Sequence, residues 1–105
     1  MKSYCGIVVA AVLATFPSTF ALGQAGADTY KAKCLMCHAA DGSGSSPAGK
    51  AMGAIPFSSP ALVKASDADL IAATTKGKGK MPAYSGKLTD AQIKDVVAYI
   101  RTLQK

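Results

Sequence analysis

One five-residue run constrains this chain more than any other part of its sequence: Cys34-Leu35-Met36-Cys37-His38. Two thiols three positions apart lie on one turn of a helix, where each can add to a vinyl group of the same porphyrin, and the next residue can place its imidazole beneath the metal. In an exported protein, a Cys-x-x-Cys-His run is typical of covalent attachment of a c-type haem. We therefore expect Cys34 and Cys37 to bind one haem c, and His38 to be the proximal ligand of its iron.

Other uses of paired cysteines need partners that this sequence does not supply. A structural zinc site needs a second pair of Cys or His ligands, and a thioredoxin-like redox pair needs a strand and a crossover helix around it. The third cysteine, Cys5, lies near the N-terminus, and His38 is the single histidine. A disulfide between Cys34 and Cys37 is the remaining alternative, and it would be excluded if the purified protein is red and heavier by one haem.

The N-terminal residues have the order of a secretory signal. Lys2 precedes an apolar stretch centred on residues 6–14, and small residues follow it. An uncleaved membrane anchor is the alternative, but the apolar centre is shorter than the roughly 20 residues that span a bilayer, and Pro17 interrupts it. Because c-type haem is joined to protein outside the cytoplasm, we expect export to a bacterial periplasm or an equivalent lumen.

These features divide the chain into a signal peptide, residues 1–23, and one domain, residues 24–105. The sequence allows cleavage at three points: after Gly23, Ala25 or Ala27. About 80 residues then remain, which is a poor size for a self-sufficient hydrophobic core. We expect the large apolar cofactor to complete that core.

The chain is basic, with a formal net charge of +6 that becomes +5 without Lys2. Most of its lysines are expected to do no more than keep a small protein in solution. Nucleic-acid binding is disfavoured by the export signal and by the small share of aromatic residues, which is 7%. The basic charge therefore does not by itself indicate nucleic acid as a partner.

The pattern of apolar residues predicts an all-α fold. No stretch after the leader alternates apolar and polar residues as a half-buried strand would. A first helix is expected from about residue 27 to 37, with Tyr30 and Cys34 one turn apart. The Gly- and Ser-rich residues 41–49 are expected to form a loop.

Two further helices carry clear end signals. One should start at Ser66, whose hydroxyl can cap a turn that includes Asp69, and should end at about Lys76, before Gly77. The other follows Thr89-Asp90-Ala91-Gln92, which repeats the capping signature. Its apolar residues recur at intervals of three and four and form one stripe: Ile93, Val96, Val97, Ile100 and Leu103.

A haem carrier also needs a second axial ligand, and a thioether is a soft ligand that favours ferrous iron. Met36 lies between the two cysteines and cannot also reach the opposite face of the haem. Met52 follows the loop only fourteen residues after His38. Met81 precedes Pro82 in an irregular stretch between two helices, where a fixed backbone can hold a side chain without helical constraints. We therefore expect Met81, rather than Met52, to be the sixth ligand.

Three segments together resemble a small class I c-type cytochrome: the run at 34–38, the run Gly79-Lys80-Met81-Pro82-Ala83-Tyr84, and the capped last helix with Val97-Ala98-Tyr99-Ile100 near its end. The resemblance covers essentially the whole chain after the leader. Short bacterial carriers and the soluble donors of oxygenic photosynthesis share the Met-Pro-Ala-aromatic segment. The resemblance implies a cytochrome c fold, in which three main helices and long irregular loops wrap one covalent haem.

The resemblance also implies how the first and last helices meet. Gly26 and Tyr30 match the family's small residue and aromatic residue on the first helix, and Tyr99 matches the aromatic residue on the last. These helices should cross, with Gly26 allowing a close approach. Cleavage before Gly26 is then favoured over cleavage after Ala27.

Other residues are implied to contact the haem or its ligand. Pro47 is similar in placement to a proline whose carbonyl accepts the proton of the proximal histidine's other nitrogen, and Pro56 is a weaker rival. Tyr84 is implied to be a cofactor-binding residue. Residues 51–59 match no pattern of the family, so the resemblance does not define the pocket near the haem propionates.

Iron that is bound by both His38 and Met81 has no open site for a substrate, which suits a one-electron carrier and not an enzyme. We expect a monomer whose partners are redox proteins with acidic docking surfaces and which makes transient contact with membrane complexes. Four lysines flank the sixth ligand and could steer these encounters: Lys76, Lys78, Lys80 and Lys87. The alternative is a haem enzyme or gas sensor in which Met81 is weakly bound, but no second histidine supplies a distal acid or base.

Overall fold

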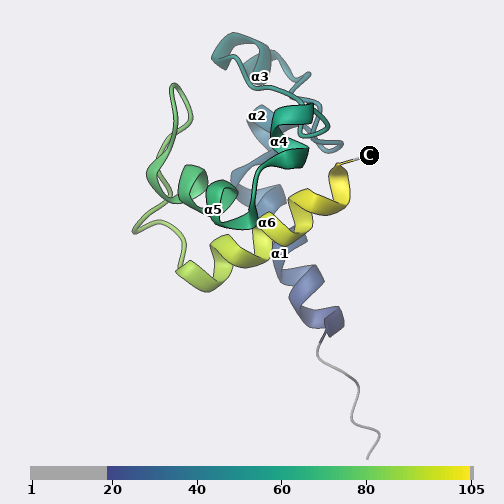
Figure 1. Ribbon diagram of the computed structural model, residues 1–105, viewed down its shortest axis with the longest axis vertical. Helices are drawn as coiled ribbons and strands as arrows, with labels where there is room; N and C mark the ends of the chain where they lie inside the picture. Colours follow the sequence, from purple (N-terminus) through teal and green to yellow (C-terminus); the bar gives the residue numbers. More distant parts are fainter. Residues whose placement is uncertain (1–18, 105) are drawn as a thin grey trace, which may run out of the picture.

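The computed structural model describes residues 19–104, and within them it forms six helices and no β-strand (Figure 1). The helices are α1 (Thr19–Lys33), α2 (Leu35–His38), α3 (Pro47–Met52), α4 (Pro60–Lys64), α5 (Asp67–Lys76) and α6 (Asp90–Leu103). The predicted all-α fold is confirmed, and the three longest helices, α1, α5 and α6, are its main ones. The expected signal peptide lies largely outside the described residues, which begin at Thr19.

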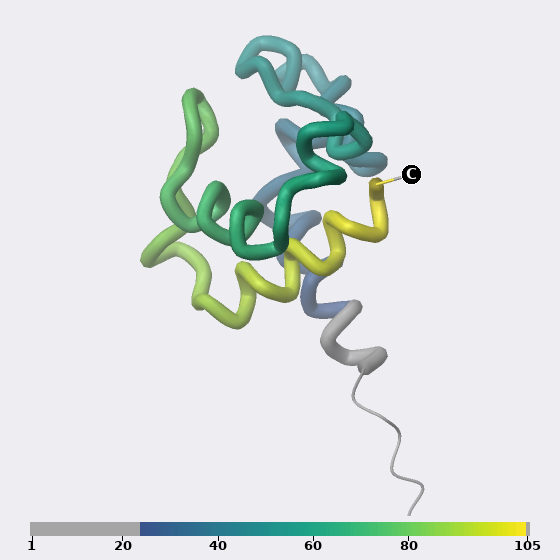
Figure 2. Tube along the Cα trace, in the orientation of Figure 1, coloured from purple at the N-terminus to yellow at the C-terminus, as the bar shows by residue number. Residues whose placement is uncertain are grey.

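Helices α1 and α6 cross (Figure 2). Gly26 of α1 lies where they meet. A Cβ atom at Gly26 would overlap the carbonyl oxygen of Asp95 on α6 and would lie 3.2 Å from the Cβ of Tyr99. The ring centroids of Tyr30 and Tyr99 are 5.2 Å apart. The predicted crossing is therefore confirmed, because only a residue without a side chain fits between these two backbones.

The variant Gly26→Ala should lower the free energy of unfolding of the haem-containing protein by about 1–3 kcal/mol, because the added methyl group forces α6 away from α1. Urea unfolding followed by helical circular dichroism measures this change. Ala32→Ser adds one atom at an exposed position of the same helix and should change the stability by less than about 0.5 kcal/mol. Equal losses in the two variants would contradict the close-packing argument.

The predicted start and end of α5 and the predicted start of α6 are also confirmed. The hydroxyl of Ser66 accepts a hydrogen bond from the backbone N–H of Asp69 at 3.1 Å, and the N–H of Gly77 donates to the carbonyl of Ala73 after the last turn of α5. At the start of α6, Thr89 and Gln92 each accept a hydrogen bond from the other's backbone N–H. Three residues of the predicted stripe are buried: Ile93, Val96 and Val97.

The expected first helix, residues 27–37, is wrong at both ends. Helix α1 begins at Thr19, because the Ala and Gln residues before position 27 favour helix and extend it toward the N-terminus. It ends at Lys33, and Cys34, with φ −114° and ψ −28°, forms a turn between α1 and α2. The cysteines are therefore divided between a turn and a separate short helix.

The expected loop at 41–49 is wrong at its last three residues, which belong to α3. Ser46 caps this helix, accepting from the N–H of Gly49 at 3.0 Å, and Pro47 occupies its first position. Helix α4, which was not predicted, also has a proline, Pro60, at its first position, but the side chain of Ser59 before it makes no capping hydrogen bond. Proline suits the first position of a helix, since its φ is preset and its missing N–H would have no intrahelical partner.

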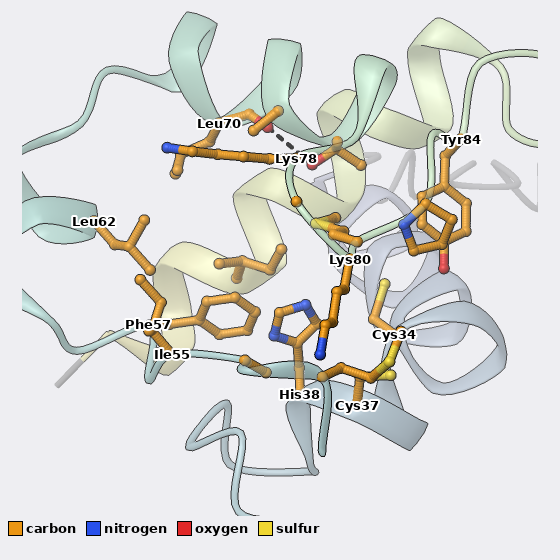
Figure 3. Close-up of a pocket in the computed structure, with 18 of the residues that line it drawn as sticks. Cys34, Cys37, His38, Ile55, Phe57, Leu62, Leu70, Lys78, Lys80 and Tyr84 are labelled. Carbon is orange, nitrogen blue, oxygen red and sulfur yellow. Dashed lines mark hydrogen bonds between the residues drawn. The ribbon is translucent and has the colours of Figure 1, made fainter. Parts of the chain in front are cut away.

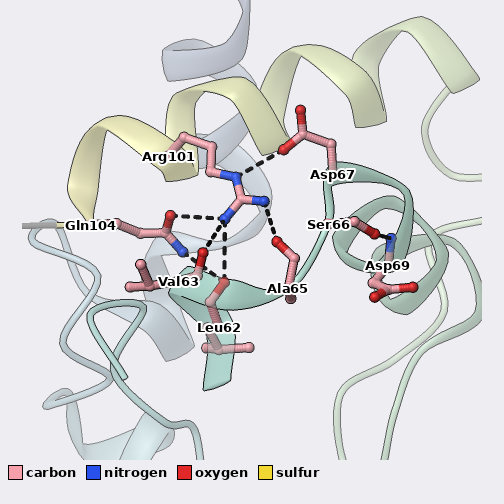
Figure 4. Close-up of polar contacts among 8 residues, drawn as sticks. All are labelled: Leu62, Val63, Ala65, Ser66, Asp67, Asp69, Arg101 and Gln104. Carbon is pink, nitrogen blue, oxygen red and sulfur yellow. Dashed lines mark hydrogen bonds and ion pairs between the residues drawn. The ribbon is translucent and has the colours of Figure 1, made fainter. Parts of the chain in front are cut away.

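Arg101 of α6 holds the chain between α4 and α5 in place (Figure 4). Its guanidinium donates to the carboxylate of Asp67 at 2.8 Å, to the carbonyl of Ala65 at 2.5 Å and to the carbonyl of Leu62 at 3.2 Å. It thereby satisfies carbonyls that the C-terminus of α4 leaves without helical partners. Leu62, which packs against the core beside Tyr30 and Phe57, is fixed by the same contacts.

Within residues 19–104, none of the helices combines the length and the apolar character that crossing a membrane requires.

Candidate haem site

A cavity of about 410 Å³ lies between the helices, and five of the predicted site residues line it: Cys34, Cys37, His38, Met81 and Tyr84. Figure 3 shows Cys34, Cys37 and His38 along one side and Leu70 and Lys78 across from them. Most of the remaining wall is apolar and is formed by Ile55, Phe57, Leu62, Leu70, Ala73, Val96 and Ile100. A largely apolar cavity with a few convergent polar groups is typical of cofactor sites.

Both cysteines of the pentapeptide are free thiols in this structure. Cys34 is buried, and burial raises its pKa to about 11, with the nearby Cys37 as a smaller cause. The backbone places these residues around one turn, since the N–H of Cys34 donates to Tyr30 at 2.9 Å and the carbonyl of Cys34 accepts from the N–H of His38 at 2.9 Å. The two thiols thus face the same cavity and are available to bind a porphyrin.

His38 presents its imidazole to the cavity as a neutral ligand. Burial lowers the pKa of His38, so that the uncharged ring that binds metals is favoured. The ring stacks on Phe57, with ring centroids 4.6 Å apart and an angle of 24° between the planes. Its Nδ1 atom is buried and has no hydrogen-bond partner among the described residues. A buried nitrogen of this kind normally has such a partner, so one is missing here.

The hydrogen bond that the resemblance implied between Pro47 and the other nitrogen of this histidine is not formed. Pro47 is exposed at the first position of α3 and is not among the residues that line the cavity. Its neighbour Ser46 contacts α2 instead: the Ser46 hydroxyl donates to the carbonyl of Met36 at 2.6 Å. Helix α3 therefore contacts the segment 34–38 through Ser46.

Met81 is held by a tight turn and a close backbone approach. The N–H of Lys78 donates to the carbonyl of Met81 at 3.2 Å, and the N–H of Met81 donates to the carbonyl of Lys78 at 3.0 Å. Gly77 has φ +75°, and a Cβ atom there would lie 2.7 Å from the carbonyl oxygen of Met81. Glycine is therefore required where the chain folds back to bring Met81 to the cavity.

Tyr84 anchors the same segment at two points. Its backbone N–H donates to the carbonyl of Thr74 on α5 at 3.1 Å, and its hydroxyl donates to the carbonyl of Lys33 at 3.0 Å. Lys33 directly precedes Cys34, so the second bond joins the Met81 segment to the start of the segment 34–38. Tyr84 thus connects the two predicted parts of the site, the segment 34–38 and the segment around Met81, which are far apart in sequence.

Met52 also lines the cavity, and 43% of its surface is exposed. Met81 is half-buried and is fixed by the turn described above. The choice of Met81 as the sixth ligand remains a prediction, and the lower exposure of the Met81 side chain favours it over Met52.

Some pocket residues were missed in the sequence, above all Phe57, Leu62 and Gln104. Phe57 is buried and contacts both His38 and Tyr30. It is the only aromatic residue of the segment 51–59. An isolated Phe in a stretch of Ser, Pro and Gly was the sequence signal that could have predicted a buried residue there. The segment that matched no family pattern therefore supplies one wall of the cavity.

The residues present fit a haem c. The cavity holds two thiols, one neutral imidazole and thioethers, and within the described chain no Asp or Glu is among its lining residues. These donors match the thioether attachment and the nitrogen and sulfur ligation of c-type haem. The buried Nδ1 without a partner is consistent with a site that a bound cofactor completes.

Comparisons with known proteins agree with this geometry. A family model described as cytochrome c oxidase, cbb3-type, subunit III, matches residues 21–100. Cytochrome c6 of Leptolyngbya boryana is 37% identical over 79 residues, which cover 72% of this chain and 86% of that protein. Cytochrome c6 of Thermosynechococcus vestitus is 32% identical over 102 residues, covering 93% of this chain and 86% of that protein.

A solved structure, the KustC0563 c-type cytochrome, has the same fold with a TM-score of 0.70 and 29% sequence identity, covering 76% of this chain and 98% of that chain. The family match spans most of the sequence, and the cavity supplies the residues that the family's cofactor needs. This chain therefore belongs to the family of small class I c-type cytochromes, which hold haem c and its iron covalently.

Proposed function

We propose that this protein is a one-electron carrier in which Cys34 and Cys37 hold the haem while His38 and Met81 ligate its iron. The observation that carries the proposal is the single cavity lined by all four side chains. Haem c supplies a one-electron iron couple when bound, and its potential depends on the axial ligands and the surroundings. The protein's own contribution is to hold both ligands and to exclude water with apolar walls.

Two features favour a carrier over a haem enzyme or gas sensor. Within the described chain the cavity lining contains no carboxylate and no second imidazole, which are the commonest general acids and bases of haem enzymes. The turn at Lys78 and the bonds of Tyr84 hold the Met81 segment against α5 and α1. A firmly held sixth ligand leaves no coordination position for a substrate.

Expression with the cytochrome maturation machinery tests the proposal. The purified protein should be red, heavier by one haem, low-spin in both oxidation states, and should show the charge-transfer band of iron bound to a thioether sulfur. The reduced protein should bind carbon monoxide slowly or not at all. Rapid binding of carbon monoxide by the wild-type protein would favour the gas sensor, and a colourless protein with a Cys34–Cys37 disulfide would exclude both.

We also propose that residues 1–23 are a cleaved signal and that the protein acts in the periplasm or an equivalent lumen. Cleavage after Gly23 or Ala25 would keep Gly26 in α1, where it contacts α6, whereas cleavage after Ala27 would remove that contact. N-terminal sequencing of the exported protein distinguishes these positions. A mature chain beginning at Asp28 would contradict the proposed role of Gly26.

The electron donor and acceptor are proposed to be redox proteins with acidic surfaces, which a monomer meets transiently. Lys76, Lys78, Lys80 and Lys87 are all exposed, and two of them, Lys78 and Lys80, line the cavity beside Met81. A cluster of like charge at the opening of a cavity raises the rate of encounter with oppositely charged partners. These four lysines, referred to below as the lysine cluster, are the proposed docking surface.

Replacing Lys78 and Lys80 by Glu should slow electron transfer with an acidic redox partner by about tenfold at low ionic strength, and the difference should shrink as salt is added. Stopped-flow kinetics over a range of salt concentrations measures this effect, with the reduction potential checked in parallel. The matched control is Lys64→Glu with Lys94→Glu, which makes the same charge change at exposed sites outside the cavity lining. If both pairs slow the reaction equally, net charge and not the lysine cluster controls encounter.

A further inference from the structure

The residue that follows the proposed proximal ligand has an unusual backbone conformation. Ala39 has φ +64° and ψ 167°, and it is the one non-glycine residue with positive φ in the part of the chain that the structure describes. This region of backbone space is essentially restricted to glycine and persists elsewhere only where the surroundings enforce it. Something must therefore hold the chain in place directly after His38.

Tyr30 supplies the strongest contact to this residue. Its hydroxyl donates to the carbonyl oxygen of Ala39 at 2.5 Å, while the N–H of Gly42 donates to the same oxygen at 3.2 Å. Only 1% of the Tyr30 surface is exposed, and its ring lies 6.3 Å from that of Phe57 and 5.2 Å from that of Tyr99. Burial raises the pKa of Tyr30, so its hydroxyl remains a proton donor throughout the physiological range.

The conformation of Ala39 determines how the chain leaves the histidine. Because the chain reverses at Ala39, the next residues fold back, and the N–H of Gly44 donates to the carbonyl of His38 at 3.0 Å. Phe57 connects the same groups from the other side, since its ring contacts both Tyr30 and the imidazole of His38. Tyr30 thus contacts both neighbours of His38: Ala39, which follows it in the backbone, and Phe57, which stacks on its ring.

We propose that Tyr30 is a positioning residue for the proximal ligand: by bonding the carbonyl of Ala39, its hydroxyl keeps the strained turn closed and sets the orientation of the His38 imidazole toward the iron. The proposal rests on the axial role of His38 proposed above. It assigns to the Tyr30 hydroxyl a function beyond the packing of its ring at the crossing of α1 and α6.

The experiment compares Tyr30→Phe, Ala39→Gly and the double variant as haem-containing proteins. Phenylalanine keeps the ring and removes only the bond to Ala39, while glycine adopts the same backbone conformation without strain. Tyr99→Phe is the matched control, because it removes a hydroxyl from a ring that packs against Tyr30, while the side-chain bond to the Ala39 carbonyl comes from Tyr30. The readouts are the haem methyl resonances of the ferric protein, which depend on the orientation of the axial imidazole plane, and the reduction potential.

Tyr30→Phe should displace or double the haem methyl resonances and shift the potential, whereas Ala39→Gly and Tyr99→Phe should leave both close to wild type. The double variant should return to the wild-type spectrum, since glycine at position 39 no longer needs the bond. An unchanged spectrum in Tyr30→Phe, or a change that Ala39→Gly does not reverse, would overturn the proposal.

Protein yield and the ligation of the wild-type protein complete the interpretation. If Tyr30→Phe fails to accumulate, recovery of the holoprotein in the double variant supports the proposal and continued failure overturns it. If the wild-type spectrum shows that His38 is not an axial ligand, the proposed function and this inference fall together. If wild-type ligation is intact but Tyr30→Phe is unchanged, the inference alone fails.

Discussion

Replacing both Cys34 and Cys37 by Ala should give a chain that carries no covalent haem and shows no cooperative thermal unfolding. The described residues bury few large side chains completely: Tyr30, Ile93, Val96 and Val97. Without the haem, the apolar lining of the 410 Å³ cavity would be exposed to water, and the burial of that surface would be lost from the core. A chain of this size cannot offset such a loss with other contacts.

Thermal unfolding followed by circular dichroism, together with the mass of the purified protein, measures this effect. The single variants Cys34→Ala and Cys37→Ala are the controls, since each keeps one thiol that can bind the haem. They should retain a cooperative transition at a lower temperature than the wild type. A cooperative transition in the haem-free double variant would show that the protein core is sufficient without its cofactor.

Met81→Ala should open one axial position of the iron. We expect complete loss of the charge-transfer band of sulfur-ligated iron, a change to high-spin ferric haem, a lower reduction potential and stoichiometric binding of carbon monoxide by the reduced protein. The physical reason is that a thioether favours ferrous iron, and its removal leaves water or an added ligand at that position. Absorption spectra and a redox titration measure all four changes.

Met52→Ala is the matched control for this experiment. Met52 also lines the cavity, but it is 43% exposed and none of the backbone bonds that hold the Met81 turn reaches it. Its removal should leave the spectrum, the spin state and the resistance to carbon monoxide unchanged. The reverse pattern, with loss of the sulfur band in Met52→Ala only, would assign the sixth position to Met52.

Much of the fold could be predicted because its signals act over a few residues. The bonds between Thr89 and Gln92 span three positions, and the end of α5 at Gly77 depends on one local conformation. Gly26 was placed correctly at the crossing through the family resemblance. Helix α3 was missed because Ser46 and Pro47 are common in loops as well as at helix starts.

The rest of the pocket depends on contacts between distant parts of the chain. Phe57 stacks on His38, and the Tyr84 hydroxyl bonds the carbonyl of Lys33, 51 residues away in sequence. Arg101 reaches Leu62 across 39 residues. No local pattern in the sequence encodes these pairings, because each depends on how the helices pack.

By itself, the sequence determined which residues can bind the cofactor: the thiols of Cys34 and Cys37 and the imidazole of His38 lie within one turn, so their spacing defines their chemistry. Only the tertiary structure decided which walls enclose them, that Met81 and Met52 both reach the cavity, and that Tyr30 contacts Ala39. The physical reason is that ligand chemistry depends on neighbouring residues along the chain, whereas a cavity exists only where separate segments pack together.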